Sequence, residues 1–431
     1  MFAKLQLTMQ LKLIENTWDN MHEKAWLNDK DIAIQDKAMF LRELANYDDS
    51  RWGIEARIWE MFVAWIWSWR VDVVVDKIIS SQALSLLDES MLVKWFDMFK
   101  NTTKKQPSLV WKKHYDIDFD LYKHMLWDTL KYTSWYWDES QYWAFDLEKS
   151  QKLCMDLICQ RLQLQNNHSV LEIWFWYGTL ANYMIENYNV SVTWLTVSQW
   201  QAHVAQQILE DHDNQQSAQL HIKDWKDIYA SPEFEESYKW KFDRIVAVEM
   251  IEAVSTTDLP MFMKFLYECL DDGGVLVLQV INSPRLVETT DGYLDQYIFP
   301  DGVIPQKQNL IDSWIQAWFK GVKIDNTMWP SYDPTLMSWQ KNLEDNYKKL
   351  QSLTDPFASD FPYSLEDPML KIFEYYLKSC AGSFRADYNQ TWHFVFHKDV
   401  GSSQSLVIPT RDEVVSILKN REWWDVAWAI A

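Results

Sequence analysis

Polar side chains stand near the ends of three successive apolar segments in the middle of the chain. Glu172 lies in SVLEIW, Ser198 ends VSVTWLTVS and Asp224 ends AQLHIKD. If these segments are parallel strands, the three side chains gather beyond the carboxyl ends of a sheet, where α/β proteins bind ligands. Each could instead be a turn or capping residue, because Asp and Ser often fill those roles. Their shared position relative to the strands favours a ligand site.

The turn after the first of these segments has an unusual composition. It reads LEIWFWYGTLA from Leu171 to Ala181, and Gly178 is its one glycine. A ligand-binding turn needs glycine, because glycine adopts positive φ and lets the backbone approach the ligand closely. Two indole rings, at Trp174 and Trp176, would fill that space. The turn as written therefore predicts poor ligand binding.

The composition of the whole chain shows the same anomaly. The 431 residues include 9 Gly and 27 Trp, whereas average usage of about 7% would give roughly 30 Gly. Hydrophobic residues make up 48% and charged residues 24% of the chain, which is ordinary for a globular protein. The net charge of −21 argues against a nucleic-acid partner, because phosphate binding needs clustered Lys and Arg.

The four cysteines, Cys154, Cys159, Cys269 and Cys380, are scattered and lack zinc-like spacing. We therefore expect reduced thiols, a cytoplasmic protein and no metal site. No run approaches the 18 apolar residues that would predict a transmembrane helix. The first residues lack the apolar core of a signal peptide.

Apolar periodicity divides the chain into three parts. Residues 1–105 predict a mainly helical N-terminal domain, since their apolar residues recur at helical spacing. Residues 106–400 alternate strands and helices, which implies an α/β domain with a parallel sheet covered by helices on both faces. Within it, residues 283–385 interrupt the alternation and are expected to form a helical cap. Residues 401–431 are a tail of unclear role. Strands are expected at 169–174, 190–198, 218–224, 241–250, 273–281 and 391–398.

Many segments resemble, in order, motifs of the cyclopropane-fatty-acyl-phospholipid synthase family. LEIWFWYGTLA resembles the family's LEIGCGWGxLA turn, VTWLTVSQWQ resembles VTGVTLSxxQ, and KWKFDRIVAVEMIEAV resembles GKFDRIVSIEMIEAV. HYDIDFDLY, LKYTSWYW, QYIFPDGVIP, SYDPTLMSW and YYLKSCAGSFR match further family segments. Ordered matches over nearly the whole chain are far more specific than a lone glycine motif. The resemblance implies an S-adenosylmethionine-dependent methyltransferase with a Rossmann-like, seven-stranded sheet.

Tryptophan repeatedly stands where the family pattern has glycine. These positions are Trp127, Trp135, Trp174, Trp176, Trp194, Trp240 and Trp329, with Trp59 and Trp65 expected to be further cases. Our leading hypothesis is that UGA codons, which some bacteria read as glycine, have been translated as tryptophan. The rival interpretations are a decayed pseudoenzyme and, more simply, a set of core aromatic residues. With glycine restored, the turn reads LEIGFGYGTLA, a normal GxGxG turn.

The resemblance places S-adenosylmethionine at the strand ends. Glu172 is expected near the cofactor's amino group, the TxSxxQ element around its ribose and adenine, and Asp224 at the adenine amino group. Tyr132 and Thr133 match a family pair that closes over the cofactor. The implied cofactor-binding residues are Tyr132, Thr133, Glu172, Trp174, Trp176, Gly178, Thr196, Val197, Ser198, Gln201, Asp224 and Trp225.

The reaction implied by the resemblance joins a methylene to the cis double bond of an unsaturated phospholipid acyl chain. Carbocation character develops, and a base then removes a methyl proton, so the site needs an apolar channel and a proton acceptor. In the family the acceptor is thought to be a bound bicarbonate ion, and the matching positions are Ser134, Glu252, Gln279 and Tyr332. Cys380 matches the cysteine regarded as the family's active-site residue. It also lies on the apolar stripe of KIFEYYLKSC, so a structural cysteine is equally expected.

Several departures from the family pattern leave other functions open. Ser134 stands where some members have Cys, and Ala253 and Gln279 stand where some have His; Phe175 and Asp118 also diverge. The alternatives are another methyltransferase acting on lipids or amines, and a cofactor-dead lipid-binding protein. By analogy with the family, we expect transient peripheral contact with the inner face of a phospholipid bilayer, through the N-terminal domain, and a homodimer.

The decoding hypothesis makes a direct prediction about the gene. We expect UGA at the codons for Trp174 and Trp176, and UGG at those for Trp67, Trp339 and Trp392, where the family itself has tryptophan. Nucleotide sequencing, together with peptide masses of the protein from its native host, checks both sets. UGG at positions 174 and 176 would end the hypothesis.

Overall fold

The computed structural model describes ten segments of the chain. They are residues 33–34, 67–68, 119–126, 129–137, 147–173, 176–283, 294–299, 302–325, 329–351 and 368–398. Trp59, Trp65, Trp127, Trp174, Phe175 and Asp118 lie outside them, as do most of residues 1–105 and the tail from residue 401. Chain contacts define two units. One comprises residues 126–288, 303–332 and 390–431, and the other residues 1–125, 289–302 and 333–389.

The first unit is built on a seven-stranded sheet with the strand order β5-β4-β3-β6-β7-β9-β8. Its strands are β3 (Ser169–Ile173), β4 (Ser191–Thr196), β5 (Ala218–Ile222), β6 (Phe242–Val248), β7 (Leu270–Asn282), β8 (Lys320–Asp325) and β9 (Gln390–His397). The pairs from β5 to β7 are parallel, and β9 runs antiparallel to both β7 and β8. The parallel strands β3 and β6 are almost continuously buried, as expected for strands covered on both faces.

Each expected strand is present, and β8 is an addition. It lies at Lys320–Asp325, within the segment expected to be a helical cap, so that expectation is wrong for these residues. The sequence KGVKID is short and polar, which gives little strand signal on its own. Its pairing with β9 at the sheet edge supplies the backbone hydrogen bonds that define it as a strand.

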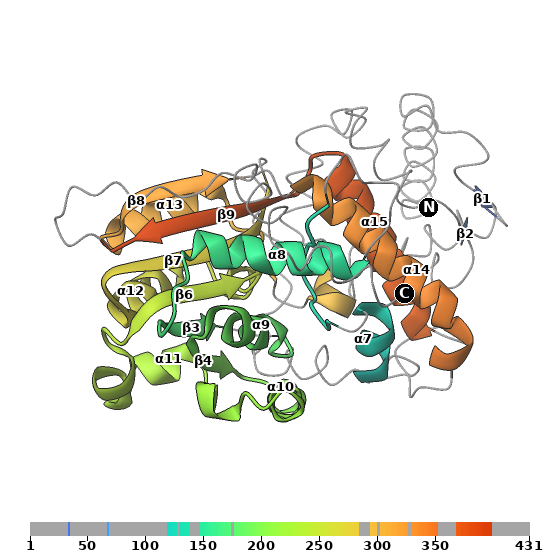
Figure 1. The fold of residues 1–431 in the computed structure, drawn as a ribbon. Coiled ribbons are helices and arrows are strands. Elements are labelled where there is room, and N and C mark those ends of the chain that lie inside the picture. The colour runs from blue at the N-terminus through green and yellow to red at the C-terminus, as the bar shows by residue number, and fades with distance from the viewer. Residues whose placement is uncertain are drawn as a thin grey trace, which may run out of the picture. The chain divides into compact units, whose positions relative to one another are not determined.

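The described part of this unit contains six α-helices, of which the first precedes β3 and the other five lie between successive strands. They are α8 (Leu147–Arg161), α9 (Thr179–Tyr188), α10 (Gln199–Asp211), α11 (Trp225–Tyr229), α12 (Leu259–Cys269) and α13 (Lys307–Gln316). In Figure 1, α8 and α9 pass in front of the strands, and they contact each other. A continuous core joins them to the sheet through residues such as Ile158, Met184, Val192, Val246 and Val277, each at most 2% exposed.

The second unit is mainly helical where it is described. It contains α7 (Phe119–Leu126), most of α14 (Tyr332–Leu350), α15 (Pro368–Arg385), and a short π-helical turn at Leu294–Ile298. The Arg385 guanidinium pairs in a bidentate manner with Asp333, with Nε and Nη2 each 2.8 Å from a carboxylate oxygen. Two short strands, β1 (Ala33–Ile34) and β2 (Trp67–Ser68), pair antiparallel. No helix in the described segments is both long and apolar enough to cross a bilayer.

The backbone at two tryptophans has the conformation that glycine prefers. Trp240 has φ +55° and Trp318 has φ +67°, and both side chains are 58% exposed. A bulky residue with positive φ is a conformational outlier, because its Cβ crowds the carbonyl oxygen. Trp240 is one of the expected glycine positions, and Trp318 adds a new one. Core packing accounts for the fully buried Trp135 and Trp194, but it does not account for an exposed indole at positive φ.

Trp318 follows the last residues of α13, where a left-handed residue closes the helix. The Phe319 N–H donates to the Trp314 carbonyl and the Trp318 N–H to the Ile315 carbonyl, at 3.3 and 3.2 Å. This pattern ends many helices and usually has glycine at the left-handed position. Trp318→Gly should therefore raise the free energy of unfolding by about 1 kcal/mol. Urea denaturation measures the change.

Trp200→Gly is the matched control, because Trp200 is also exposed but has a helical backbone in the first turn of α10. Glycine is a poorer helix former than tryptophan and should lower stability there by about 0.5 kcal/mol. Opposite signs for the two substitutions are expected, and a destabilised Trp318→Gly would contradict the assignment of a glycine position.

Candidate active site

Glu172 lies near the end of β3 with a carboxylate oxygen that lacks a partner among the described residues. The residue is 5% exposed, and its Oε2 atom is buried without a hydrogen bond. Burial raises the pKa of Glu172 to about 8, and the charge of Lys131 opposes the shift. A buried polar atom without a partner is rare in folded proteins. This oxygen fits the expected role of accepting a hydrogen bond from a ligand.

The TxSxxQ element at the end of β4 forms one hydrogen-bonded unit. The Ser198 hydroxyl caps α10 by accepting from the Gln201 N–H at 3.2 Å, and the Thr196 hydroxyl accepts from the Ser198 N–H at 3.1 Å. Thr196 donates to Gln201 Oε1 at 3.1 Å. Gln201 Nε2 is buried and lacks a partner, so a donor remains for a ligand. Val197, between Thr196 and Ser198, is half-buried.

The turn between β3 and α9 is crowded by tryptophan. Gly178 has φ +80°, and a Cβ placed on it would lie 2.9 Å from the Trp194 ring. The Trp194 indole therefore fills the space directly against the turn. Trp176 is half-buried and meets the Tyr132 ring edge-on, with 4.8 Å between the centroids. The Tyr132 ring, which is expected to close over the cofactor, is therefore in contact with the Trp176 indole instead.

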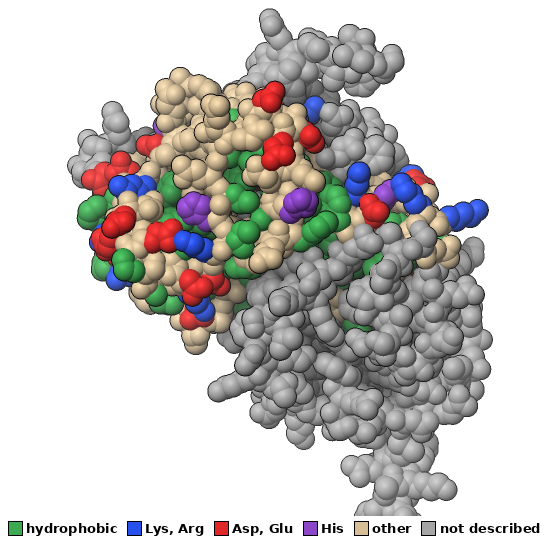
Figure 2. Space-filling view, turned by 90° about the horizontal axis from the view of Figure 1, so that it is seen from below, with side chains coloured by type: hydrophobic (Ala, Val, Ile, Leu, Met, Phe, Trp, Pro, Cys, Tyr) green, Lys and Arg blue, Asp and Glu red, His purple; other side chains and the backbone are tan. Residues whose placement is uncertain are grey.

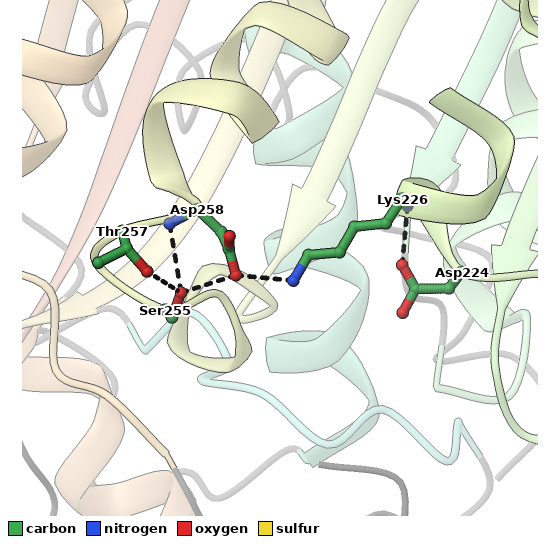
Figure 3. A network of polar contacts seen from close by, with 5 residues as sticks. All are labelled: Asp224, Lys226, Ser255, Thr257 and Asp258. Atoms are coloured by element: carbon green, nitrogen blue, oxygen red, sulfur yellow. Dashed lines mark hydrogen bonds and ion pairs between the residues drawn. The ribbon is translucent and has the colours of Figure 1, made fainter. Parts of the chain in front are cut away.

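Asp224 and Trp225 have structural partners. Asp224 caps α11 by accepting from the Lys226 N–H at 2.8 Å, and the Lys226 ammonium bonds Asp258 at 2.6 Å. Figure 3 shows this chain of contacts running on to Ser255, in the loop before α12. Trp225 packs against Phe262, with ring centroids 5.1 Å apart. The capping interpretation therefore holds for one Asp224 oxygen, and the expected adenine contact is a prediction that the geometry leaves open.

A second polar cluster lies where β6 and β7 run side by side. The Tyr332 hydroxyl donates to Glu249 Oε2 at 2.7 Å, and Gln279 Nε2 donates to Glu249 Oε1 at 2.9 Å. Gln279 Nε2 also lies 2.6 Å from the Thr133 hydroxyl. Hydrogen bonds from Thr133 and from the Ser134 backbone favour the charged form of Glu249, while burial is the larger influence and raises its pKa. The expected residues Gln279 and Tyr332 are therefore brought together.

Glu252 lies beside this cluster in the turn after β6. Its Oε1 atom accepts from the Ile281 N–H at 2.5 Å, and its Oε2 atom is buried without a partner. Burial raises the pKa of Glu252 to about 8, with a further contribution from the charge of Glu249. Two carboxylates at close range repel each other, and this repulsion raises the pKa of a carboxyl group. Both carboxyl groups therefore hold a proton more strongly than an exposed glutamate does.

The remaining expected residues have other contacts. The Ser134 hydroxyl donates to the Trp135 carbonyl at 3.2 Å, so the residue reaches Glu249 through its backbone rather than its side chain. Cys380 belongs to α15 in the other unit, where it is half-buried and its carbonyl accepts from Ser383 at 2.8 Å. Its proposed role stays a prediction. All four cysteines are described, and no disulfide joins them. The described residues include no group of His, Cys, Asp and Glu placed to hold a metal ion.

Sequence reasoning missed two residues of the polar cluster. Glu249 was available as the acidic residue that directly follows the buried strand β6. His393 lies opposite Gln279 on the antiparallel strand β9, and its Nε2 atom is 2.9 Å from Gln279 Oε1. Burial lowers the pKa of His393 well below its usual value, so the ring is neutral and donates from Nε2. No local signal marks His393, because its role depends on strand pairing.

The strand order, with one antiparallel strand inserted beside the last parallel one, and the ligand-facing strand ends define a methyltransferase of the α/β class. The chain belongs to the mycolic acid cyclopropane synthetase family, whose model matches residues 100–394. It is an S-adenosylmethionine-dependent methyltransferase by family and fold.

Curated and solved relatives agree with this membership. The cyclopropane-fatty-acyl-phospholipid synthase of Escherichia coli K12 is 29% identical over 309 residues, which are 70% of this chain and 71% of the relative. The sphingolipid C9-methyltransferase of Komagataella phaffii is 27% identical over 298 residues, 68% of this chain and 58% of the relative. Among solved structures, the cyclopropane synthase MmaA2 of Mycobacterium tuberculosis has a TM-score of 0.57, and the mycolic acid cyclopropane synthase CmaA1, solved with SAH and CTAB, has a TM-score of 0.56. Each is 22% identical and covers 69% of this chain and all of that one.

The described residues offer partners for the polar groups of the cofactor, but tryptophan side chains fill the space in which the cofactor would lie against the turn. Glu172 Oε2 and Gln201 Nε2 are buried polar atoms without partners at the ends of β3 and β4, where the amino and ribose groups are expected. Trp176 and Trp194 occupy the space against the turn. Glycine at these positions removes the obstruction while leaving the polar atoms in place. The misfit is therefore confined to positions that the decoding hypothesis assigns to glycine.

The raised pKa of Glu172 predicts a pH-dependent stability. A carboxyl group whose pKa is about 8 when folded and about 4.3 when unfolded holds its proton more strongly in the folded state. Stability is then greatest below the unfolded value and falls as pH rises toward 8. Glu172→Gln should remove a loss on the order of 2 kcal/mol between pH 5.5 and 8. Urea denaturation at the two pH values measures it.

Glu235→Gln serves as the control, because Glu235 is 65% exposed and pairs with Lys239 on the surface. Its substitution should leave the pH dependence unchanged. An unchanged pH dependence in Glu172→Gln would show that Glu172 does not hold a proton in the folded protein.

Proposed function

We propose that the protein is a cyclopropane synthase that acts on the cis double bonds of unsaturated phospholipid acyl chains. The observation that carries the proposal is the polar cluster around Glu249, Gln279 and Tyr332 at the carboxyl ends of β6 and β7. A cluster of this kind provides a proton acceptor, which cyclopropane formation requires and simple methyl transfer to an amine does not. The similarity to the Escherichia coli synthase supports the same reaction.

S-adenosylmethionine, when bound, supplies an electrophilic methyl group. The chain's own residues then have three tasks. Glu172 and Gln201 offer buried polar atoms to the bound molecule. The Tyr332 ring, 5% exposed, can face developing positive charge, and the Glu249 cluster receives a proton. The resemblance assigns the acceptor to a bicarbonate ion held by Ser134, Glu252, Gln279 and Tyr332, and the hydrogen bonds of Gln279 and Tyr332 to Glu249 support an acceptor site near these residues.

The substrate surface is proposed to be a phospholipid bilayer, contacted transiently from the cytoplasmic side. Figure 2 shows one face of the described part, on which Lys and Arg side chains are interspersed with Asp and Glu. With a net charge of −21, attraction to anionic lipids is weak, so apolar contact has to provide docking. Exposed apolar side chains at Met261 and Ile315 offer such contact.

A lipid methyltransferase that leaves a methyl branch is the second candidate, favoured by the similarity to sphingolipid C9-methyltransferase. It would need the same cofactor and a different fate for the carbocation. The nature of the product therefore separates the two candidates more directly than cofactor binding.

The test uses the full chain in two forms, as printed and with glycine at positions 135, 174, 176, 194 and 240. We expect calorimetry to show S-adenosylmethionine binding at least tenfold tighter in the glycine form, about 1.4 kcal/mol, because the turn is no longer blocked. With vesicles of cis-unsaturated phosphatidylethanolamine, this form should convert the alkene to a cyclopropane, detected by proton NMR of the extracted lipid.

Three outcomes decide between the candidates. Cyclopropane protons with loss of alkene support the proposal. A methyl branch would replace it with the second candidate. Absence of S-adenosylmethionine binding in the glycine form would sink the enzyme interpretation and favour a lipid-binding pseudoenzyme.

A further inference from the structure

Four hydrogen-bond donors converge on the carboxylate of Glu249. The Tyr332 hydroxyl donates to Oε2 at 2.7 Å and Gln279 Nε2 to Oε1 at 2.9 Å, and the Thr133 hydroxyl and the Ser134 backbone N–H also bond it. Three of these four residues, Ser134, Gln279 and Tyr332, are ones that the resemblance assigns to a bicarbonate ion. In this chain, their donors are directed at a side-chain carboxylate instead.

A carboxylate and a bicarbonate ion present the same planar O–C–O acceptor to such donors. Donors that are bonded to Glu249 are not available to hold a second anion in the same place. We propose that Glu249 is the general base of the reaction and takes the place of bicarbonate. This inference rests on the proposed cyclopropane synthase function.

A hydrogen bond from His393 fixes the orientation of the Gln279 side-chain amide. The neutral His393 ring donates from Nε2 to Gln279 Oε1 at 2.9 Å, which turns Gln279 Nε2 toward Glu249. Both residues are at most 1% exposed, and Nδ1 of His393 is buried without a partner. A flipped amide would bring two N–H donors together and leave Glu249 without one of its donors. His393 is therefore a positioning residue for the base.

The backbone holds Glu249 in an uncommon conformation directly after the carboxyl end of β6. Its φ is +49°, and its N–H donates to the Gln279 carbonyl at 2.8 Å. Non-glycine residues in the left-handed region carry strain that concentrates at functional sites. The Glu249 side chain is partly exposed, whereas its partners Thr133, Gln279 and Tyr332 are buried.

The neighbouring carboxyl group supplies the other half of an acid–base pair. Glu252 keeps its proton near neutral pH, because burial and the charge of Glu249 raise its pKa to about 8. Side-chain donors converge on Glu249, whereas Glu252 accepts from one backbone N–H, so the hydrogen bonds stabilise a single negative charge better on Glu249. Environments that separate two carboxyl groups in this way assign the acid and the base roles.

The proposed step balances as follows. The alkene carbon bonds the methyl carbon while the sulfur–methyl bond breaks and sulfur keeps its electron pair. Glu249 then takes a proton from that methyl group, and the C–H electron pair closes the second carbon–carbon bond onto the cationic carbon. The products are a cyclopropane, a thioether and a protonated Glu249. The proton passes to water after the lipid leaves.

The test compares Glu249→Gln and Glu249→Ala in the glycine form of the full chain, with Glu235→Gln as an exposed control. Glu249→Gln keeps the shape and should lower the rate of cyclopropane formation by roughly 10²- to 10⁴-fold, with S-adenosylmethionine affinity unchanged. In Glu249→Ala, added bicarbonate should restore part of the rate in a saturable manner. The glycine form with Glu249 intact, called the unsubstituted protein from here on, should form cyclopropane at the same rate when bicarbonate is removed.

A measurement that needs no turnover tests the same point. ¹³C NMR of labelled bicarbonate should show line broadening with the cofactor-free Glu249→Ala protein and none with the unsubstituted protein. Thermal unfolding of each variant verifies that it is folded. Bicarbonate binding to the unsubstituted protein, or a Glu249→Gln rate within threefold of it, would overturn the inference.

The two proposals fail in different ways. If the unsubstituted protein forms another lipid product, the proposed function is wrong, and the bicarbonate-binding measurement still decides what occupies the cluster. If cyclopropane forms at an undiminished rate in Glu249→Gln, the function stands and Glu249 is not the base.

Discussion

The parallel pairing of β6 with β7 positions the carboxyl groups and the amide at the centre of the polar cluster. Val248 is aligned with Gln279 across the two strands, and the next residue, Glu249, bonds the Gln279 carbonyl through its own N–H. The same alignment places the Ile281 N–H within reach of Glu252. A shift of one residue would turn Gln279 to the other face of the sheet. The chemistry of the cluster therefore depends on strand register.

Three further segments complete the cluster around this pair of strands. Residues 129–137 bring Thr133 and the Ser134 backbone, and the start of α14 brings the Tyr332 hydroxyl. The antiparallel strand β9 contributes His393 from the opposite side. Polar groups buried together in this way are costly unless each finds a partner. Within the described residues the cluster meets this demand, apart from Glu252 Oε2 and His393 Nδ1.

The tryptophans at expected glycine positions behave differently from one another in the fold. Trp194 is accommodated in the core against the turn that carries Gly178, and Trp135 is fully buried. Trp240 stands exposed at positive φ, which a core aromatic has no reason to adopt. Side-chain packing cannot explain why tryptophan stands at all these positions, because their environments differ. Misread glycine codons provide one, because they need no common structural role.

By itself, the sequence determined the α/β class, the positions of six strands, and the family, because apolar periodicity and ordered motifs are local properties of the chain. It also determined Glu172, Thr196 and Gln201 as strand-end residues, since each lies within a few residues of the strand it follows. Only the tertiary structure decided that β8 completes the sheet and that Asp224 caps a helix. It also decided that the side chains of Thr133, Gln279 and Tyr332 all donate hydrogen bonds to Glu249. Those contacts join residues far apart in the chain, and strand register and side-chain burial alone bring them within hydrogen-bond distance.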